Sequence, residues 1–186
     1  MEIFVTRFDK KTISENKIWI SNNNEIGCIY GTPIKLSEKL LPESQIIVIE
    51  MNNSSNSIEG IGIIKNKLVL HDKKKYKIYQ ENNYNRFIYK SNMRIDKTSF
   101  NNYEKIIINN LEKLLFKSHN HCKRGQGIQH IPKHINENKD FNYKRFLYNM
   151  YYNRFLHINK EKLIIKNNHF NQNNHFNQNN NFNQKQ

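Results

Sequence analysis

The sequence predicts one α+β domain in which a mixed or antiparallel, partly closed β-sheet packs against one long helix. Three observations support this fold class. Segment 45–65 holds two runs of strand-forming residues around a polar turn, and segment 98–118 repeats apolar residues at helical spacing. At 186 residues, the chain is long enough for one domain with a hydrophobic core and short for two. A C-terminal helix and a disordered tail are expected to follow.

Segment 45–65 is expected to form a β-hairpin at the centre of the sheet. Ile46–Ile49 is a β-branched apolar run, and Ile58–Ile64 is a second run that two glycines interrupt. The turn is Asn52–Ser57, whose asparagines and serines hydrogen-bond their own backbone. The glycines indicate a bulge or a close backbone approach beside the second strand.

Three further strands and a short helix are expected before this hairpin. Patterns of apolar residues between polar turns predict strands at three places: Met1–Phe8, Lys17–Ile20 and Ile26–Tyr30. Thr32 can cap a short helix with Pro33 at its first position, and this helix would end near Leu41.

One more strand and two helices are expected after the hairpin. Arg86–Lys90 alternates basic with aromatic or apolar residues, as a half-buried strand does. Thr98–Ser118 has apolar residues three or four positions apart, which predicts an amphipathic helix. Asn101 and Glu104 can form a capping box at its start, although the helix could equally begin at Thr98 or Ser99. The aromatic-rich segment 140–157 also has a helical pattern.

These elements suggest three regions along the chain. Residues 1–135 are expected to form the α+β core domain, and residues 136–166 an aromatic and basic helical extension. Residues 167–186 repeat the sequence HFNQNN with a six-residue period and contain too few apolar residues to bury a core. We expect this tail to be disordered.

The composition favours a polyanionic partner. The formal net charge is +14, and residues 119–186 hold 11 basic residues against 3 acidic ones. Nucleic acid is the simplest such partner, with an anionic membrane surface as the second choice. The first residues lack a signal-peptide pattern, and no apolar run approaches the about 20 residues that span a bilayer. Two cysteines are too few for a disulfide framework, which fits a reducing compartment. Together these features predict a soluble, intracellular protein that is not membrane-bound.

The segment Cys122–Ile128, CKRGQGI, is the most suggestive short motif. Lys123 and Arg124 precede Gly125 and Gly127, and glycines let backbone amides approach a phosphate. The segment lacks the Lys-Ser/Thr pair of a Walker A sequence. Two interpretations stay open: a phosphate or nucleobase contact, and a glycine turn packed on the domain.

Basic residues interleaved with aromatic residues give a second signal for nucleic acid. They occur in Arg86–Lys90 and in Lys144–Arg154. Aromatic rings stack on bases while cations follow the phosphates of a single strand. We expect Arg86 and Lys90 to extend the basic face of Lys123 and Arg124, because none of the four stands beside acidic residues in the sequence. The alternative for the second segment is an aromatic helix face turned toward a core.

Histidines and one cysteine crowd into sixteen positions after the long helix. They are His119, His121, Cys122, His130 and His134. The H-x-x-x-H spacing resembles that of a zinc site, but the basic neighbours of Cys122 oppose a cation. We therefore assign no metal, cofactor or catalytic residue, and a Cys/His zinc site or a Cys-dependent enzyme remains the alternative.

Four short motifs carry a resemblance to known proteins. They are EMNN at Glu50–Asn53, GIG at Gly60–Gly62, NRFIYK at Asn85–Lys90 and KRGQGI at Lys123–Ile128. In this order they resemble uncharacterised proteins of giant DNA viruses, which implies a location in the host cytoplasm or the virion. The strand order is also similar to that of PUA-like β-barrels of the EVE or YTH type. Such folds hold a nucleobase in an aromatic pocket, which implies Trp19 and Tyr30 as pocket residues here.

The expected function is a non-enzymatic nucleic-acid-binding module, with RNA or a single strand as the favoured partner. A viral structural or assembly protein is the alternative from another class. The sequence leaves the oligomeric state open.

Overall fold

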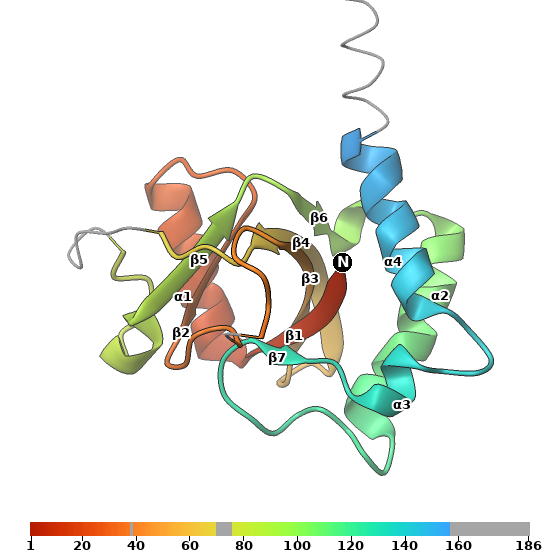
Figure 1. Cartoon of the computed structure of the whole chain (residues 1–186). Coiled ribbons are helices and arrows are strands. Elements are labelled where there is room, and N and C mark those ends of the chain that lie inside the picture. Colours follow the sequence, from red (N-terminus) through yellow and green to blue (C-terminus); the bar gives the residue numbers. More distant parts are fainter. Residues whose placement is uncertain (38, 70–75, 157–186) are drawn as a thin grey trace, which may run out of the picture. The chain divides into compact units, whose positions relative to one another are not determined.

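The computed structural model describes residues 1–37, 39–69 and 76–156 of the chain (Figure 1). The chain divides into one unit at Met1–Tyr148 and a second that begins at Asn149, and each is described by itself. The predicted disordered tail and the lysine run at 73–75 lie outside the described residues.

A mixed five-stranded sheet forms the centre of the first unit (Figure 1). Its strands, in spatial order, are β6 (Arg94–Asp96), β4 (Ser57–Lys65), β3 (Gln45–Asn52), β1 (Glu2–Phe8) and β7 (Gln129–His130). The β1–β3 pair is parallel and the other pairs are antiparallel. The prediction of an α+β fold with a mixed sheet is therefore confirmed.

A second, two-stranded sheet pairs β2 (Cys28–Thr32) with β5 (Phe87–Ser91) in antiparallel fashion. The predicted strand at 86–90 is thus confirmed as β5. The backbone N–H of Ile63 in β4 donates to the carbonyl of Met93 at 2.9 Å, which joins the central sheet to the segment between β5 and β6. The strands of the described residues do not close into a barrel.

The predicted central hairpin is confirmed as β3 and β4. The side chain of Asn52 organises its turn by accepting hydrogen bonds from the backbone N–H groups of Ser54 and Ser55. The ladder register shifts beside Glu50, so that Glu59 is an extra residue in β4 and forms the expected bulge. Gly62 permits a close approach, because a Cβ there would lie 2.0 Å from the hydroxyl of Tyr30.

The strand predicted at Lys17–Ile20 is wrong, because these residues belong to helix α1 (Lys10–Asn22). Asp9 caps this helix and forms a capping box with Thr12. Trp19 is buried on the helix face that points toward the core.

The short helix predicted after Thr32 is also wrong, since residues 33–37 and 39–44 contain no helix. Thr32 is the last residue of β2 and pairs with Phe87. Its hydroxyl donates to the carbonyl of Ile34 at 2.9 Å instead of capping a helix.

Helix α2 (Asn102–Glu112) and a following π-turn (Lys113–Lys117) occupy the segment with the predicted long helix. The predicted capping box of Asn101 and Glu104 is confirmed. Thr98 and Ser99 lie in a short 3-10 turn before it. A second 3-10 turn covers Asn82–Asn85.

Two further helices follow in the C-terminal part of the described chain. They are α3 (Lys133–Asn136) and α4 (Tyr143–Tyr151), and a π-turn (Tyr152–Leu156) continues the second. No helix of the described residues is long and apolar enough to cross a membrane.

Both faces of the central hairpin are covered, which explains its continuous apolar runs. Helix α1, β2 and β5 lie on one side of the five-stranded sheet and α2 lies on the other (Figure 1). Ile46 and Val48 join the core cluster that contains Trp19 and Tyr30. Successive strand residues point to opposite faces, so Ile47 and Ile49 are buried on the side of α2.

Candidate functional site

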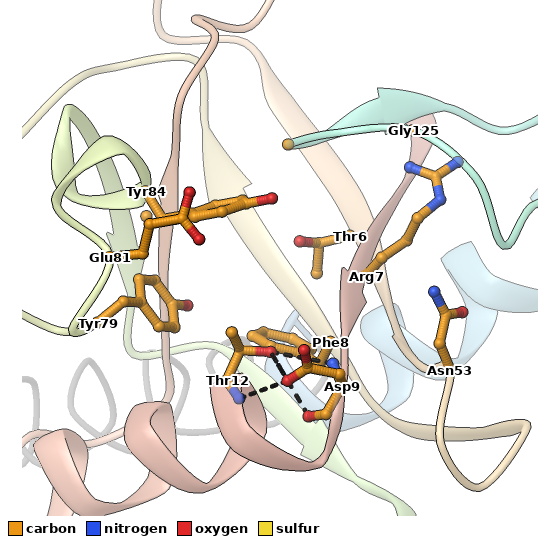
Figure 2. Close-up of a pocket in the computed structure, with 12 residues that line it drawn as sticks. Thr6, Arg7, Phe8, Asp9, Thr12, Asn53, Tyr79, Glu81, Tyr84 and Gly125 are labelled. Atoms are coloured by element: carbon orange, nitrogen blue, oxygen red, sulfur yellow. Dashed lines mark hydrogen bonds between the residues drawn. The ribbon is translucent and has the colours of Figure 1, made fainter.

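A cleft of about 200 Å³ opens where β1 passes into α1 (Figure 2). Five separate segments of the chain line it. The lining residues are Thr6, Arg7, Phe8, Asp9, Thr12, Gly31, Asn53, Tyr79, Glu81, Tyr84, Gly125 and Gly127. Most of them are polar or aromatic, in contrast to the apolar core beneath.

The open edge of β1 forms the middle of the cleft. Strand β7 pairs only with Phe4 and Val5, so the last residues of β1, Thr6–Phe8, extend beyond it. On the other side of β1, the parallel pairing continues past β3, because the backbone N–H of Asn53 donates to the carbonyl of Phe8 at 2.7 Å. The cleft is therefore anchored on the parallel β1–β3 pair.

Asp9 closes the cleft at the start of α1. Its Oδ1 accepts from the backbone N–H of Thr12 at 2.7 Å and from the Thr12 hydroxyl at 2.8 Å. These hydrogen bonds, the backbone one first, lower the pKa of Asp9 below its usual value. Asp9 is thus an ionised helix cap, already engaged by its own helix.

Two tyrosines form one wall of the cleft. Tyr79 is buried, and its hydroxyl accepts from the side-chain amide of Asn16 at 3.1 Å. Tyr84 is partly exposed and packs edge-on against Tyr79, with ring centroids 6.2 Å apart. Burial raises the pKa of both hydroxyls, so both remain neutral donors at physiological pH. Tyr84 is therefore the ring that a ligand can reach.

The glycine loop of CKRGQGI forms the opposite rim. Gly125 and Gly127 have φ angles of +121° and +70°, which other residues rarely adopt. A Cβ on Gly127 would also lie 2.2 Å from the hydroxyl of Thr32. The loop therefore packs on the domain, as the second interpretation expects, and it also borders the cleft.

Two side chains attach this loop to the central sheet. Arg7 Nε donates to the carbonyl oxygen of Cys122, and Asn53 Nδ2 donates to that of Lys123 at 2.9 Å. Each keeps one buried polar atom, Arg7 Nη1 and Asn53 Oδ1, that has no hydrogen-bond partner in the described part of the chain. Burial lowers the pKa of Arg7 below its usual value, although arginine remains charged. An unpaired buried polar atom costs about 1–3 kcal/mol and requires an explanation.

Of the predicted site residues, Gly125 and Gly127 line this cleft. Lys123 and Arg124 belong to the same loop but do not line the cleft, and neither do Arg86 and Lys90. Lys123 and Arg124 make no ion pair with any described residue. The exposed guanidinium of Arg86 lies 5.4 Å from the centroid of the Phe87 ring. The expectation that Lys90 lacks an acidic partner is wrong, because its Nζ lies 2.6 Å from a Glu25 carboxylate oxygen.

Trp19 and Tyr30 are not among the residues that line the cleft. Trp19 is 9% exposed and stacks on Tyr76, and Tyr30 is 1% exposed with its hydroxyl on Glu50. The aromatic positions of the cleft are held instead by Tyr79 and Tyr84.

The predicted histidine and cysteine cluster does not assemble. Among the described residues, no three His, Cys, Asp or Glu side chains lie where they could share a metal ion. Cys122 is buried, and burial raises the pKa of its thiol, which disfavours the thiolate that a nucleophile or metal ligand needs. His119, His121, His130 and His134 are exposed.

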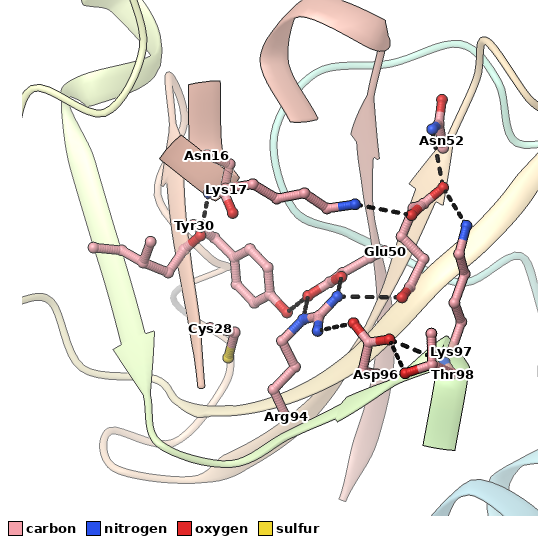
Figure 3. A network of polar contacts seen from close by, with 12 residues as sticks. Asn16, Lys17, Cys28, Tyr30, Glu50, Asn52, Arg94, Asp96, Lys97 and Thr98 are labelled. Carbon is pink, nitrogen blue, oxygen red and sulfur yellow. Dashed lines mark hydrogen bonds and ion pairs between the residues drawn. The ribbon is translucent and has the colours of Figure 1, made fainter. Parts of the chain in front are cut away.

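A second polar region lies at the β3–β4 bulge (Figure 3). Arg94 donates from Nε and Nη2 to the two oxygens of Glu50, at 2.8 and 2.7 Å, and from Nη1 to Asp96 at 2.6 Å. The hydroxyl of Tyr30 donates to Glu50 at 2.8 Å. Every nitrogen of this guanidinium is paired.

Glu59, the bulge residue, is the centre of a neighbouring group in this region. Its carboxylate is 6% exposed and lies 2.9 Å from Lys97 Nζ and 3.3 Å from Lys17 Nζ. Asn52 Nδ2 also donates to it at 3.1 Å. Burial opposes the charge of Glu59, but these contacts outweigh it and lower its pKa. Glu59 therefore ties α1 and the turn after β6 to β4.

Sequence reasoning found the glycine loop but missed Arg7, Asn53, Tyr79 and Tyr84. Arg7 is the one cation in the predicted strand Met1–Phe8, which is a signal that sequence reading could have used. Asn53 ends the EMNN motif quoted above. The two tyrosines lie in a segment without regular periodicity, so no local pattern marks them.

Comparison with protein-family models, curated proteins and solved structures gives no match to this chain. The function therefore has to be inferred from the geometry of the cleft.

Proposed function

We propose that the protein is a non-enzymatic nucleic-acid-binding module that holds one base of a single strand in the cleft beside Tyr84. The basic glycine loop then follows the phosphates. One observation carries this proposal: Lys123 and Arg124, which have no acidic partner among the described residues, belong to the loop that borders a cleft with a reachable aromatic ring. Cations beside an aromatic platform are the arrangement that holds single strands.

The size and charge of the cleft agree with this proposal. Its volume of about 200 Å³ is below the about 300–1,000 Å³ of pockets that enclose drug-sized ligands, and it suits a single base or nucleotide unit. Arg7 adds a buried cation without a carboxylate partner in the described chain. The proposal keeps the PUA-like interpretation of an aromatic pocket beside a basic surface, but places the pocket at Tyr79 and Tyr84.

The test is a binding titration of a labelled single-stranded oligonucleotide at three salt concentrations. Because each phosphate contact releases counterions, the double variant Lys123→Ala/Arg124→Ala should reduce the slope of log affinity against log salt by about 1–2. The matched control is Lys113→Ala/Lys117→Ala, which removes two exposed charges from the turn after α2 and should leave the slope unchanged.

Two results would count against the proposal. Absence of binding by the wild-type protein at low salt would end the nucleic-acid hypothesis. An equal loss of slope in both double variants would show that net charge, rather than the glycine loop, determines binding.

An assembly role is the second candidate, because α2 exposes large apolar side chains. Tyr103 and Ile106 are 61% and 62% exposed and lie three residues apart, on one face of the helix. The substitution Ile106→Asp should abolish any self-association seen by light scattering while leaving nucleic-acid affinity unchanged. A monomeric wild-type protein at high concentration would remove self-assembly.

A further inference from the structure

The parallel β1–β3 pair leads Arg7 and Asn53 to the same loop. Arg7 lies opposite Met51, and Asn53 is the turn residue directly after β3, whose backbone N–H donates to the carbonyl of Phe8. Arg7 donates to the carbonyl of Cys122 and Asn53 to that of Lys123, on the side of β1 away from the tyrosines (Figure 2).

The hydrogen bonds to the loop determine which polar atom of each side chain has no partner. Because Asn53 Nδ2 donates to the carbonyl of Lys123, Oδ1 is the oxygen that faces away as an acceptor. Because Arg7 Nε is held by the carbonyl of Cys122, Nη1 is left as a donor. Two residues that line the cleft thus carry one donor and one acceptor that are buried and unpaired among the described residues.

If single-stranded nucleic acid crosses the open edge of β1, its base and its sugar-phosphate backbone lie on opposite sides of the cleft. Its base belongs on the side of Tyr79 and Tyr84, where a ring can stack. Its sugar and phosphate then lie on the side of Arg7 and Asn53. A phosphate oxygen only accepts hydrogen bonds, which suits Arg7, whereas Asn53 Oδ1 needs a donor that the sugar must supply.

We infer that the cleft selects RNA over DNA, with Asn53 Oδ1 accepting from a ribose 2′-hydroxyl while Arg7 Nη1 donates to the adjacent phosphate. This inference depends on the proposed nucleic-acid function and names its ligand class. The 2′-hydroxyl is the donor that deoxyribose lacks. Both protein atoms are covered in this structure, so binding requires a small shift of the glycine loop. The two glycines permit that shift.

The test compares three oligonucleotides of one sequence at one salt concentration: single-stranded RNA, its 2′-O-methyl form and single-stranded DNA. The wild-type protein should bind RNA about three- to tenfold more tightly than the other two, which is the range of one net hydrogen bond. The variant Asn53→Ala should lose this preference by weakening RNA binding alone. Asn102→Ala, an exposed asparagine at the start of α2, is the control and should keep the preference.

The outcomes separate this inference from the proposed function. Equal binding of all three oligonucleotides by the wild-type protein would overturn the inference and leave the nucleic-acid function intact, whereas no binding of any would overturn both. An Asn53→Ala variant that weakens RNA and DNA equally would show a structural role for Asn53. If this variant does not fold, the comparison of the three oligonucleotides on the wild-type protein still tests whether the cleft selects RNA over DNA.

Discussion

Two partly buried arginines of this protein differ in how completely their guanidinium groups are hydrogen-bonded. Arg94 donates from all three nitrogens to the carboxylates of Glu50 and Asp96, within one closed network (Figure 3). Arg7 donates to a single backbone carbonyl, and its Nη1 has no partner in the described chain. Burial opposes charge at both, yet the bonds to Glu50 outweigh it at Arg94 and raise its pKa, while the pKa of Arg7 is lowered.

The difference shows which region stabilises the fold and which is left available for a ligand. A buried charge with complete partners stabilises a particular arrangement of strands, and removing one partner is costly. A buried charge without partners lowers stability, and proteins tolerate this cost where function requires it. We therefore expect substitutions in the two regions to separate stability from binding.

The largest expected effect is on stability, from Glu50→Ala. This change leaves the buried Arg94 without its main partner and should lower the free energy of unfolding by about 3–5 kcal/mol. Urea denaturation followed by circular dichroism measures it. A loss below about 1 kcal/mol would mean that water replaces Glu50 and that the network is not structural.

The next effect is on binding, from Tyr84→Ala. Removing the stacking ring should weaken single-strand binding by about 1–3 kcal/mol with little change of the salt slope. Trp19→Ala is the comparison, since Trp19 lies in the core and its loss should lower the free energy of unfolding by about 3–5 kcal/mol. Weaker binding by correctly folded Trp19→Ala with unchanged binding by Tyr84→Ala would return the base pocket to Trp19.

A smaller effect on stability is expected from Arg7→Met, which replaces an incompletely paired cation by an apolar chain of similar length. The free energy of unfolding should change by less than about 1 kcal/mol or increase, because the unpaired donor is removed. Oligonucleotide affinity, measured in parallel, should fall at least about fivefold. If Arg7→Met and Arg94→Met destabilise the protein equally, the contrast between the two arginines is wrong.

The smallest effect concerns pH. Burial opposes the charge of Asp96, but hydrogen bonds from Arg94 and Thr98 outweigh it and lower its pKa from 3.8 to about 2. Since the folded state holds this carboxylate ionised, its contribution to stability is complete above pH 3.8 and is lost as the pH falls toward about 2. The free energy of unfolding of the wild-type protein should therefore decline more steeply over this interval than that of Asp96→Asn. Parallel slopes would contradict the role of Asp96.

Local signals in the sequence predicted the elements that depend on neighbouring residues. The β3–β4 hairpin follows from two β-branched runs around Asn52–Ser57, and the start of α2 follows from Asn101 and Glu104. The prediction of a strand at Lys17–Ile20 was wrong because a short apolar run fits a strand or a helix equally well. The deciding signal was Asp9 with Thr12, a capping pair outside that run. The prediction of a helix after Thr32 was wrong because the pairing of β2 with β5 overrode a local capping signal.

The cleft was predictable only in part, because local signals identify residues that are neighbours in the sequence but not those that meet through the fold. Lys123, Arg124 and the two glycines form one continuous motif, so the sequence alone identifies them. Arg7 and Asn53 meet this loop only through the parallel β1–β3 register, which joins residues more than forty positions apart. No short pattern encodes such a pairing.

The position of β1 between β3 and β7 also bears on when this protein can finish folding during synthesis. β1 is the first strand made, yet its partners are residues 46–52 on one edge and residues 129–130 on the other. A nascent chain that has released only its first half therefore exposes one edge of β1, and such edges pair with other chains. The segment that covers the edge arrives directly after the glycine loop, so the last long-range step of assembling the sheet is also the step that completes the cleft.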